Sequence, residues 1–231
     1  MINEKTKVNG IPAIIWGPNS EKAYISVHGK KSKKEETEFF AQIAQEHGYQ
    51  VISFDLPEHG ERVNEKYPCD IWNGIHDLNL IVQYAQLKWK NLSLYANSLG
   101  AYFSLMTYKD MQFNKCLFHS PILDMERLIQ NMMKWFNVDE KQLQEKGEIE
   151  TPMGEVLSWD YYSFVKNNRI VKWNITTSIL YGTADNLTER TVVDEFTNKY
   201  KCKLEIVEGG QHYFTTRNEI ESLEKWIRNN V

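Results

Sequence analysis

The sequence predicts an α/β fold in which a mostly parallel central sheet is flanked by helices. Short apolar runs rich in β-branched and aromatic residues alternate with stretches of helical periodicity, which is the pattern of such a sheet. The chain has 231 residues, a common length for one α/β domain, so we expect residues 1–231 to fold as a single domain.

The strands are expected in order along the chain, beginning with a hairpin within Val8–Trp16. The runs that follow are brief and largely apolar, which is typical of parallel strands buried on both faces. They are Ala23–Val27, Gln50–Phe54, Leu92–Tyr95, Lys115–Phe118, Ser178–Tyr181 and Lys203–Val207.

Helices are expected in the gaps between these strands. Two of them begin with a capping-box pattern, in which Ser or Thr is followed three residues later by Glu. These pairs are Ser32 with Glu35, and Thr216 with Glu219. The other two helices carry apolar residues at helical spacing. The four helices are Lys33–His47, Asn73–Lys88, Leu99–Met111 and Arg217–Asn230.

The alternation of strands and helices stops for about 60 residues before Ser178, far beyond the length of a normal connection. We therefore expect residues 122–169 to form an inserted helical lid with two or three helices. This interval is rich in methionine and aromatic residues, and Met132, Trp135 and Trp159 are candidates for lining an apolar substrate pocket. Ordinary packing between lid and body would also account for such residues.

Composition and charge narrow the partners and the location. A formal net charge of −4 provides no field that would attract nucleic acid. The amino-terminal residues are mostly polar and no apolar stretch has membrane length, so we expect neither a signal peptide nor stable membrane insertion. Cys69, Cys116 and Cys202 suit reduced thiols, which favours a cytoplasmic location. No ligand-spacing motif predicts a metal site.

A candidate nucleophile stands where a strand turns into a helix, in Ala96-Asn97-Ser98-Leu99-Gly100. This is the nucleophile-elbow pattern with alanine in place of its first glycine. Small residues are needed on both sides of Ser98 because the turn is strained and neighbouring backbones pass close to it. A serine that only caps the helix is the alternative.

Two further residues follow strands in the order that a serine triad of this kind requires. Asp185 comes just after the strand ending at Tyr181, and His212 follows the last strand. Nucleophile, acid and base would then occur in the order Ser98, Asp185, His212. Asp124 also follows a strand and is the alternative acid.

Two loops complete the predicted site. His28-Gly29-Lys30 follows an apolar strand, where its backbone can place the N–H of Lys30 beside that of Leu99 to bind a developing oxyanion. His119 follows the strand ending at Phe118 and is a candidate for lining the pocket, although a structural role is the commoner one for such a histidine.

These residues resemble those of the α/β-hydrolase superfamily, and within it the small bacterial esterases, lipase-like enzymes and acyl-hydrolases. The resemblance runs from the His28 loop through Asp55–Arg62, which looks like the family segment D-x-P-G-H-G-x-S, to His212. The sequence departs from the family at Ala96 and Glu58, where the family has glycine, and at Arg62, where it has serine.

The resemblance implies hydrolysis of an ester, thioester or amide through an acyl-enzyme, without a cofactor. From the apolar side chains of the insertion we expect a small or medium apolar acyl ester as substrate. A thioester, a peptide or a carbon–carbon bond remains an alternative for the same triad, and a non-catalytic binding module of this fold remains an alternative from another class. Nothing in the sequence indicates the oligomeric state.

Overall fold

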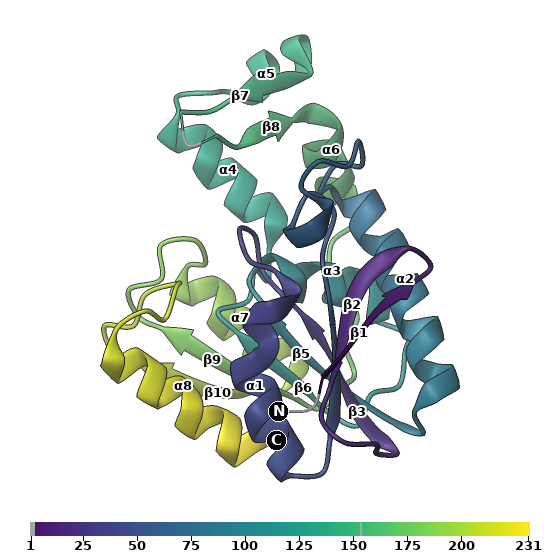
Figure 1. Cartoon of the computed structure of the whole chain (residues 1–231). Coiled ribbons are helices and arrows are strands. Elements are labelled where there is room, and N and C mark those ends of the chain that lie inside the picture. The colour runs from purple at the N-terminus through teal and green to yellow at the C-terminus, as the bar shows by residue number, and fades with distance from the viewer. Residues whose placement is uncertain (1–2, 153) are drawn as a thin grey trace.

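The computed structural model describes residues 3–152 and 154–231, which form an eight-stranded central sheet (Figure 1). The strand order is β1-β2-β4-β3-β5-β6-β9-β10. The pairs β1–β2 and β2–β4 are antiparallel, and the other five pairs are parallel. The predicted α/β class with a mostly parallel sheet is confirmed. The strands are β1 (Asn3–Val8), β2 (Ile11–Trp16), β3 (Lys22–Val27), β4 (Gln50–Phe54), β5 (Asn91–Asn97), β6 (Cys116–His119), β9 (Thr177–Gly182) and β10 (Lys203–Val207).

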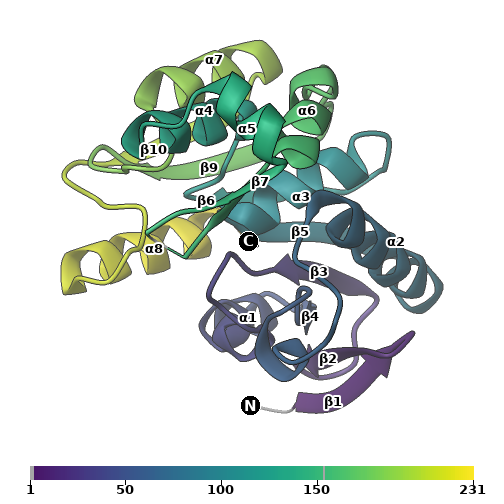
Figure 2. The same cartoon turned by 90° about the horizontal axis from the view of Figure 1, so that it is seen from above.

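Helices cover both faces of the sheet, with α1 and α8 on one face and α2, α3 and α7 on the other (Figure 2). Alternate strand residues meet the two layers. Tyr24 packs in the core that contains Phe40 of α1 and Trp226 of α8, whereas Ala23 and Ile25 belong to the core shared with α2 and α3. None of the described helices is long and apolar enough to cross a bilayer. The helices are α1 (Glu38–Glu46), α2 (Ile71–Lys88), α3 (Leu99–Tyr108), α7 (Arg190–Tyr200) and α8 (Arg217–Asn230).

The amino-terminal hairpin is longer than the predicted span of Val8–Trp16. Strand β1 begins at Asn3 and lies at the edge of the sheet, where most of its side chains are exposed. Asn9 and Gly10 join the two strands with φ of 49° and 88°, as a tight hairpin turn requires. The polar sequence concealed β1 because an edge strand has little apolar surface to bury.

The capping box predicted for Ser32 and Glu35 is wrong. The segment begins with a 3₁₀ turn whose N-cap residue makes no side-chain cap bond, and Ser32 donates its hydroxyl to the Glu36 carboxylate instead (2.8 Å). The second capping box, formed by Thr216 and Glu219 at the start of α8, is confirmed.

The segment between β6 and β9 projects from the α/β body (Figure 1). Its hairpin was not expected from the sequence, because each strand is only three residues long and, among the described strands, the two pair only with each other. The elements of this insertion are α4 (Met125–Trp135), α5 (Glu140–Lys146), β7 (Glu148–Glu150), β8 (Val156–Ser158) and α6 (Trp159–Asn167).

The insertion rests on the body at both of its long helices. Trp72 of α2 packs against Tyr161 and Phe164 of α6, with ring centroids 6.2 Å and 5.5 Å away. At the start of α4, Arg127 donates to the carboxylate of Glu189, the residue that precedes α7 (2.9 Å). The insertion therefore sits against the edge of the body that carries the loops after β5, β6 and β9.

Candidate active site

Ser98 lies at the turn between β5 and α3. Its backbone has φ 49° and ψ −121°, a conformation that residues other than glycine rarely adopt and that is often found at functional sites. The N–H of Ser98 donates to the His119 carbonyl on β6 (3.2 Å). Gly100 is required because a Cβ there would clash with the carbonyl oxygens of Val27 and His28. The turn has the geometry of a nucleophile elbow.

Three side chains form a continuous chain of hydrogen bonds at this turn. Ser98 Oγ lies 2.8 Å from His212 Nε2, and His212 Nδ1 lies 2.8 Å from Asp185 Oδ2. Because a carboxylate only accepts hydrogen bonds, His212 donates from Nδ1 to Asp185, and its Nε2 is left to accept the hydroxyl proton of Ser98. The side chains of His212 and Asp185 are buried. Such an arrangement can withdraw a proton from the serine.

The Asp185 carboxylate is fixed by the backbone that follows β9. Its Oδ1 accepts hydrogen bonds from the N–H groups of Leu187 (2.8 Å) and Thr188 (2.9 Å), which turns Oδ2 towards His212. Asp124, the alternative acid, serves as the N-cap of α4. The structure therefore brings Asp185 to the histidine and places Asp124 elsewhere.

A buried carboxylate on α8 holds the loop that carries His212. Glu219 accepts hydrogen bonds from the N–H groups of Gln211 (2.7 Å), Thr215 (3.1 Å) and Thr216 (2.8 Å), on both sides of the histidine. These bonds, that of the Gln211 amide foremost, lower the pKa of Glu219 to about 2. The carboxylate is charged at neutral pH and ties the loop to the start of the helix.

The loop after β3 lies beside Ser98. A Cβ on Gly29 would come within 2.9 Å of the Ser98 Cβ, so only glycine fits there without displacement. The next amide in the loop is that of Lys30, and the amide of Leu99 opens α3. No hydrogen bond from either amide to another described residue is found. The Leu99 amide lies at the start of a helix, where an unpaired N–H favours a bound negative charge.

Two histidines hold this loop from the side of β4. His28 Nε2 accepts the N–H of Leu56 (3.0 Å), and His28 Nδ1 lies 2.7 Å from the Gly29 carbonyl oxygen. His59 Nε2 accepts the N–H of Lys31 (3.0 Å). Burial lowers the pKa of His28 to about 4, so its imidazole is neutral and shapes the loop.

A cavity of about 410 Å³ opens in front of Ser98 and His212. His119 lines this cavity, and so does Ser120, the next residue after β6. Among the described lining residues, Phe214 alone has a side chain composed only of carbon and hydrogen. The described lining residues are Gly29, Lys30, Lys31, Ser32, Glu36, Asn97, Ser98, His119, Ser120, His212, Tyr213, Phe214 and Thr215.

Met132, Trp135 and Trp159 are not among the described residues that line this cavity. Met132 is half-buried against the core, Trp135 is 46% exposed at the end of α4, and Trp159 packs on Tyr162 within the insertion, with ring centroids 6.0 Å apart. The prediction that they line the pocket does not match this geometry. The apolar side chains of α4 pack against other parts of the protein, and their sequence spacing does not reveal which surface they cover.

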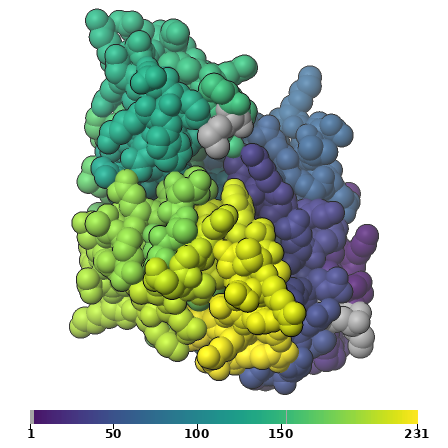
Figure 3. All heavy atoms as spheres, turned by 90° about the vertical axis from the view of Figure 1, so that its left-hand side faces the viewer, coloured from purple at the N-terminus to yellow at the C-terminus, as the bar shows by residue number. Residues whose placement is uncertain are grey.

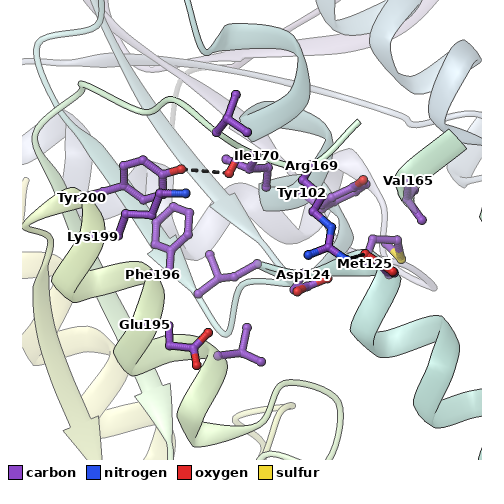
Figure 4. Close-up of a pocket in the computed structure, with 14 residues that line it drawn as sticks. Tyr102, Asp124, Met125, Val165, Arg169, Ile170, Glu195, Phe196, Lys199 and Tyr200 are labelled. Carbon is purple, nitrogen blue, oxygen red and sulfur yellow. Dashed lines mark hydrogen bonds and ion pairs between the residues drawn. The ribbon is translucent and has the colours of Figure 1, made fainter. Parts of the chain in front are cut away.

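A second cavity of about 260 Å³ lies at the base of the insertion, between α3, α6 and α7 (Figure 4). Tyr200 on its wall donates its hydroxyl to the Ile170 carbonyl (2.9 Å). Neither Ser98 nor His212 is among its described lining residues, so this cavity is distinct from the first. Within residues 3–152 and 154–231, no three His, Cys, Asp or Glu side chains converge to hold a metal ion.

Two site residues were not recognised from the sequence. Glu219 was identified only as part of a helix cap. Its position one short loop after His212 could have indicated that its carboxylate contacts that loop. Ser120 carried no motif, and only its position directly after a central strand could have drawn attention to it.

The sequence matches no known family model and no curated protein. Solved structures match it over nearly the whole chain. Est1E from Butyrivibrio proteoclasticus with ferulic acid bound has a TM-score of 0.77 and 17% identity, covering 98% of this chain and 96% of its own. An esterase from Pyrococcus furiosus has a TM-score of 0.70 and 20% identity, with 99% and 90% covered. Mouse alpha/beta hydrolase domain-containing protein 10 has a TM-score of 0.75 and 13% identity, with 99% and 98% covered.

These similarities establish the α/β-hydrolase fold for the chain. At such low identity they establish the fold alone, and the chemistry must be argued from the side chains that this chain places at the site.

Proposed function

We propose that this chain is a serine hydrolase that cleaves carboxylic esters, with Ser98 as nucleophile, His212 as general base and Asp185 as the group that orients the imidazole. The observation that carries the proposal is the pair of 2.8 Å hydrogen bonds joining these side chains at a strained turn. The fold supports it, because α/β-hydrolases use nucleophile, acid and base in this chain order. The name of the Pyrococcus furiosus neighbour, an esterase, agrees with it.

In the proposed mechanism, His212 Nε2 takes the hydroxyl proton as Ser98 Oγ attacks the ester carbonyl. The Asp185 carboxylate stabilises the imidazolium that forms. His212 then passes the proton to the leaving alcohol oxygen, and the acyl group stays on Ser98. Water, activated by the same imidazole, attacks this acyl-enzyme and releases the carboxylic acid.

The backbone amides of Lys30 and Leu99 would stabilise the oxyanion that forms on the carbonyl oxygen. Their position beside Ser98 and the absence of another described partner for either N–H support this role. Removing one such donor costs about 10²- to 10³-fold in kcat in enzymes where it has been tested.

We propose that residues 122–169 act as a lid over Ser98. In support, Glu155, between β7 and β8, forms an ion pair with the side chain of Lys30, whose amide is a proposed oxyanion donor. Figure 3 shows the insertion, in teal and green, meeting the blue segment that follows β3. The β7–β8 hairpin thus reaches Lys30, one of the residues that line the cavity.

The cavity has the volume for a small ester, and its described lining combines polar groups with the apolar atoms of the same side chains, so both polar and apolar substituents fit it. The structure of Est1E with ferulic acid shows a small carboxylic acid bound to a protein of the same fold. Thioesters, peptides and carbon–carbon bonds require the same three side chains, and activity on a substrate panel separates them from esters.

Labelling with a fluorophosphonate, followed by peptide mapping, tests the proposal against a non-catalytic binding module. The expected result is a single adduct on Ser98 and none in the Ser98→Ala variant. An adduct elsewhere, or no adduct on folded protein, would overturn the proposed function.

A further inference from the structure

Two polar side chains beside Ser98 have no role in the proposed mechanism. His119 ends β6 and is paired in register with Asn97, the residue before the nucleophile. Ser120 follows it. Both are buried, with 8% and 2% of their surface exposed, and both line the cavity that contains Ser98 and His212.

Neither side chain is satisfied by the residues that the structure describes. His119 Nε2 and Ser120 Oγ are buried atoms without a hydrogen-bond partner among the described residues. A buried polar atom left unpaired destabilises a fold substantially, so each such atom calls for an explanation. Ser120 also has φ 43°, a strained conformation for a residue with a side chain. Unpaired polar atoms and local strain together are typical of a site that is completed by a ligand.

The imidazole of His119 packs against an aromatic ring and is neutral. Its ring stands edge-on to Phe214, at 4.6 Å between centroids and an interplanar angle of 89°. Burial, and then the nearby His212, lower the pKa of His119 to about 3. The neutral ring offers one donor and one acceptor, and the Ser120 hydroxyl can do both. Together they match a ligand hydroxyl, which also donates and accepts.

The position of these residues indicates which part of the substrate they meet. The proposed oxyanion loop follows β3, and His119 ends β6, so the two lie on opposite sides of β5. Phe214, which packs on His119, is only two residues beyond His212 in the same loop. His212 delivers its proton to the departing alcohol oxygen, so the alcohol portion of an ester must lie on the His212 side.

We propose that His119 and Ser120 form a subsite that hydrogen-bonds a second hydroxyl on the alcohol portion of the substrate. The substrate class is then an ester of a polyhydric alcohol, such as a glycol, glycerol or a sugar. This inference rests on the proposed function and names the substrate class of the same site.

The test compares two ester pairs in which one methyl group is replaced by a hydroxyl of similar size. The first pair, propyl butyrate and 2-hydroxyethyl butyrate, places the change on the alcohol. The second pair, propyl butyrate and propyl 3-hydroxypropanoate, places it on the acid. For the unmodified protein we expect kcat/KM to be roughly tenfold or more higher for 2-hydroxyethyl butyrate than for propyl butyrate, and nearly equal within the second pair.

Variants show whether these two residues cause the preference. In His119→Phe and Ser120→Ala the ratio for the first pair should fall towards one, and His119→Gln, which keeps a hydrogen-bonding group, should restore part of it. A purely structural role would lower kcat/KM equally for both members of the pair and leave the ratio unchanged.

The inference is overturned if the unmodified protein shows no preference in the first pair, if the preference appears in the acid pair instead, or if the ratio survives in folded variants. The comparison within the unmodified protein stands even if a variant does not fold. If fluorophosphonate labels Ser98 while these esters react without preference, the proposed function survives and the subsite fails. If no ester reacts and Ser98 is not labelled, both are overturned.

Discussion

Replacing Glu219 with glutamine tests how the loop of His212 is held in place. The carboxylate accepts four hydrogen bonds, from the N–H groups of Gln211, Thr215 and Thr216 and from the Thr216 hydroxyl. Glutamine keeps one of the two oxygens and replaces the other by an NH₂ group, which cannot accept. At least one side of the loop must therefore lose its partner.

The pKa of Glu219 gives the size of the effect. The bonds from the Gln211 amide and from Thr216 lower this pKa from 4.5 to about 2. One pKa unit corresponds to about 1.4 kcal/mol, so the lowering amounts to about 3 kcal/mol, and because glutamine keeps one accepting oxygen the expected loss is about 2 kcal/mol. The folded-state pKa lies below the unfolded one. The stabilisation is therefore fully present above about pH 4.5 and is lost as the pH falls towards 2.

Urea denaturation and ester hydrolysis measure the two consequences. In Glu219→Gln the free energy of unfolding at pH 7 should fall by about 2 kcal/mol, and the difference from the unmodified protein should shrink as the pH falls from about 5 to 2. The kcat should fall roughly tenfold, because small displacements of a catalytic group are costly.

Asp70→Ala is a matched control, because Asp70 caps α2 by accepting the N–H of Asn73 (2.8 Å), and none of its side-chain hydrogen bonds among the described residues reaches the His212 loop. It should cost about 1 kcal/mol of stability and change kcat by no more than about twofold. A folded Glu219→Gln protein with unchanged kcat would show that the loop of His212 is held without the carboxylate, contrary to this prediction.

Three further predictions concern the acid, the insertion and a buried histidine. Asp185→Asn should lower kcat by about 10³- to 10⁴-fold, whereas Asp124→Asn should alter mainly stability through α4, and the reverse result would mean that the wrong carboxylate has been assigned. Trp135→Ala should leave the ratio of kcat/KM for short and long acyl esters unchanged, because this side chain does not line the cavity; a tenfold shift would place it there. Burial lowers the pKa of His28 to about 4, below its ordinary value of 6.5. The unfolded chain therefore binds the proton more readily than the folded one, and the free energy of unfolding should fall as the pH drops from about 6.5 to 4. In His28→Gln, the free energy of unfolding measured by chemical denaturation should depend less on pH over this range. An equal dependence would contradict the assignment of this effect to His28.

The sequence allowed most of the sheet to be predicted, because its strands are short apolar runs between turn residues. The predicted boundaries of β4 and β10 coincide with those of the structure. β1 was missed because it is a polar edge strand, and the β7–β8 hairpin because three residues are too few for a periodic signal. Such elements form through pairing with other strands, and local sequence does not encode that pairing strongly.

The hydrogen-bonded side chains of the candidate site could also be anticipated, because the loops after parallel strands meet at one edge of the sheet. The lining of the cavity could not. Methionine and tryptophan content showed that the insertion buries apolar surface, but which surface Met132 and Trp159 cover depends on the angle at which α4 and α6 pack. Likewise, the cavity is lined by His119, Ser120 and the loop after β3, which are far apart in sequence.

Trapping the acyl-enzyme tests whether Ser98 is the nucleophile. A 4-nitrophenyl ester is mixed with the protein, the reaction is quenched within its first turnovers, and the intact mass and peptide map are measured. We expect a mass increase equal to the acyl group, located on Ser98, and neither adduct nor turnover in Ser98→Ala. Turnover that persists in Ser98→Ala, or an acyl group found on another residue, would contradict the assignment of Ser98 as nucleophile.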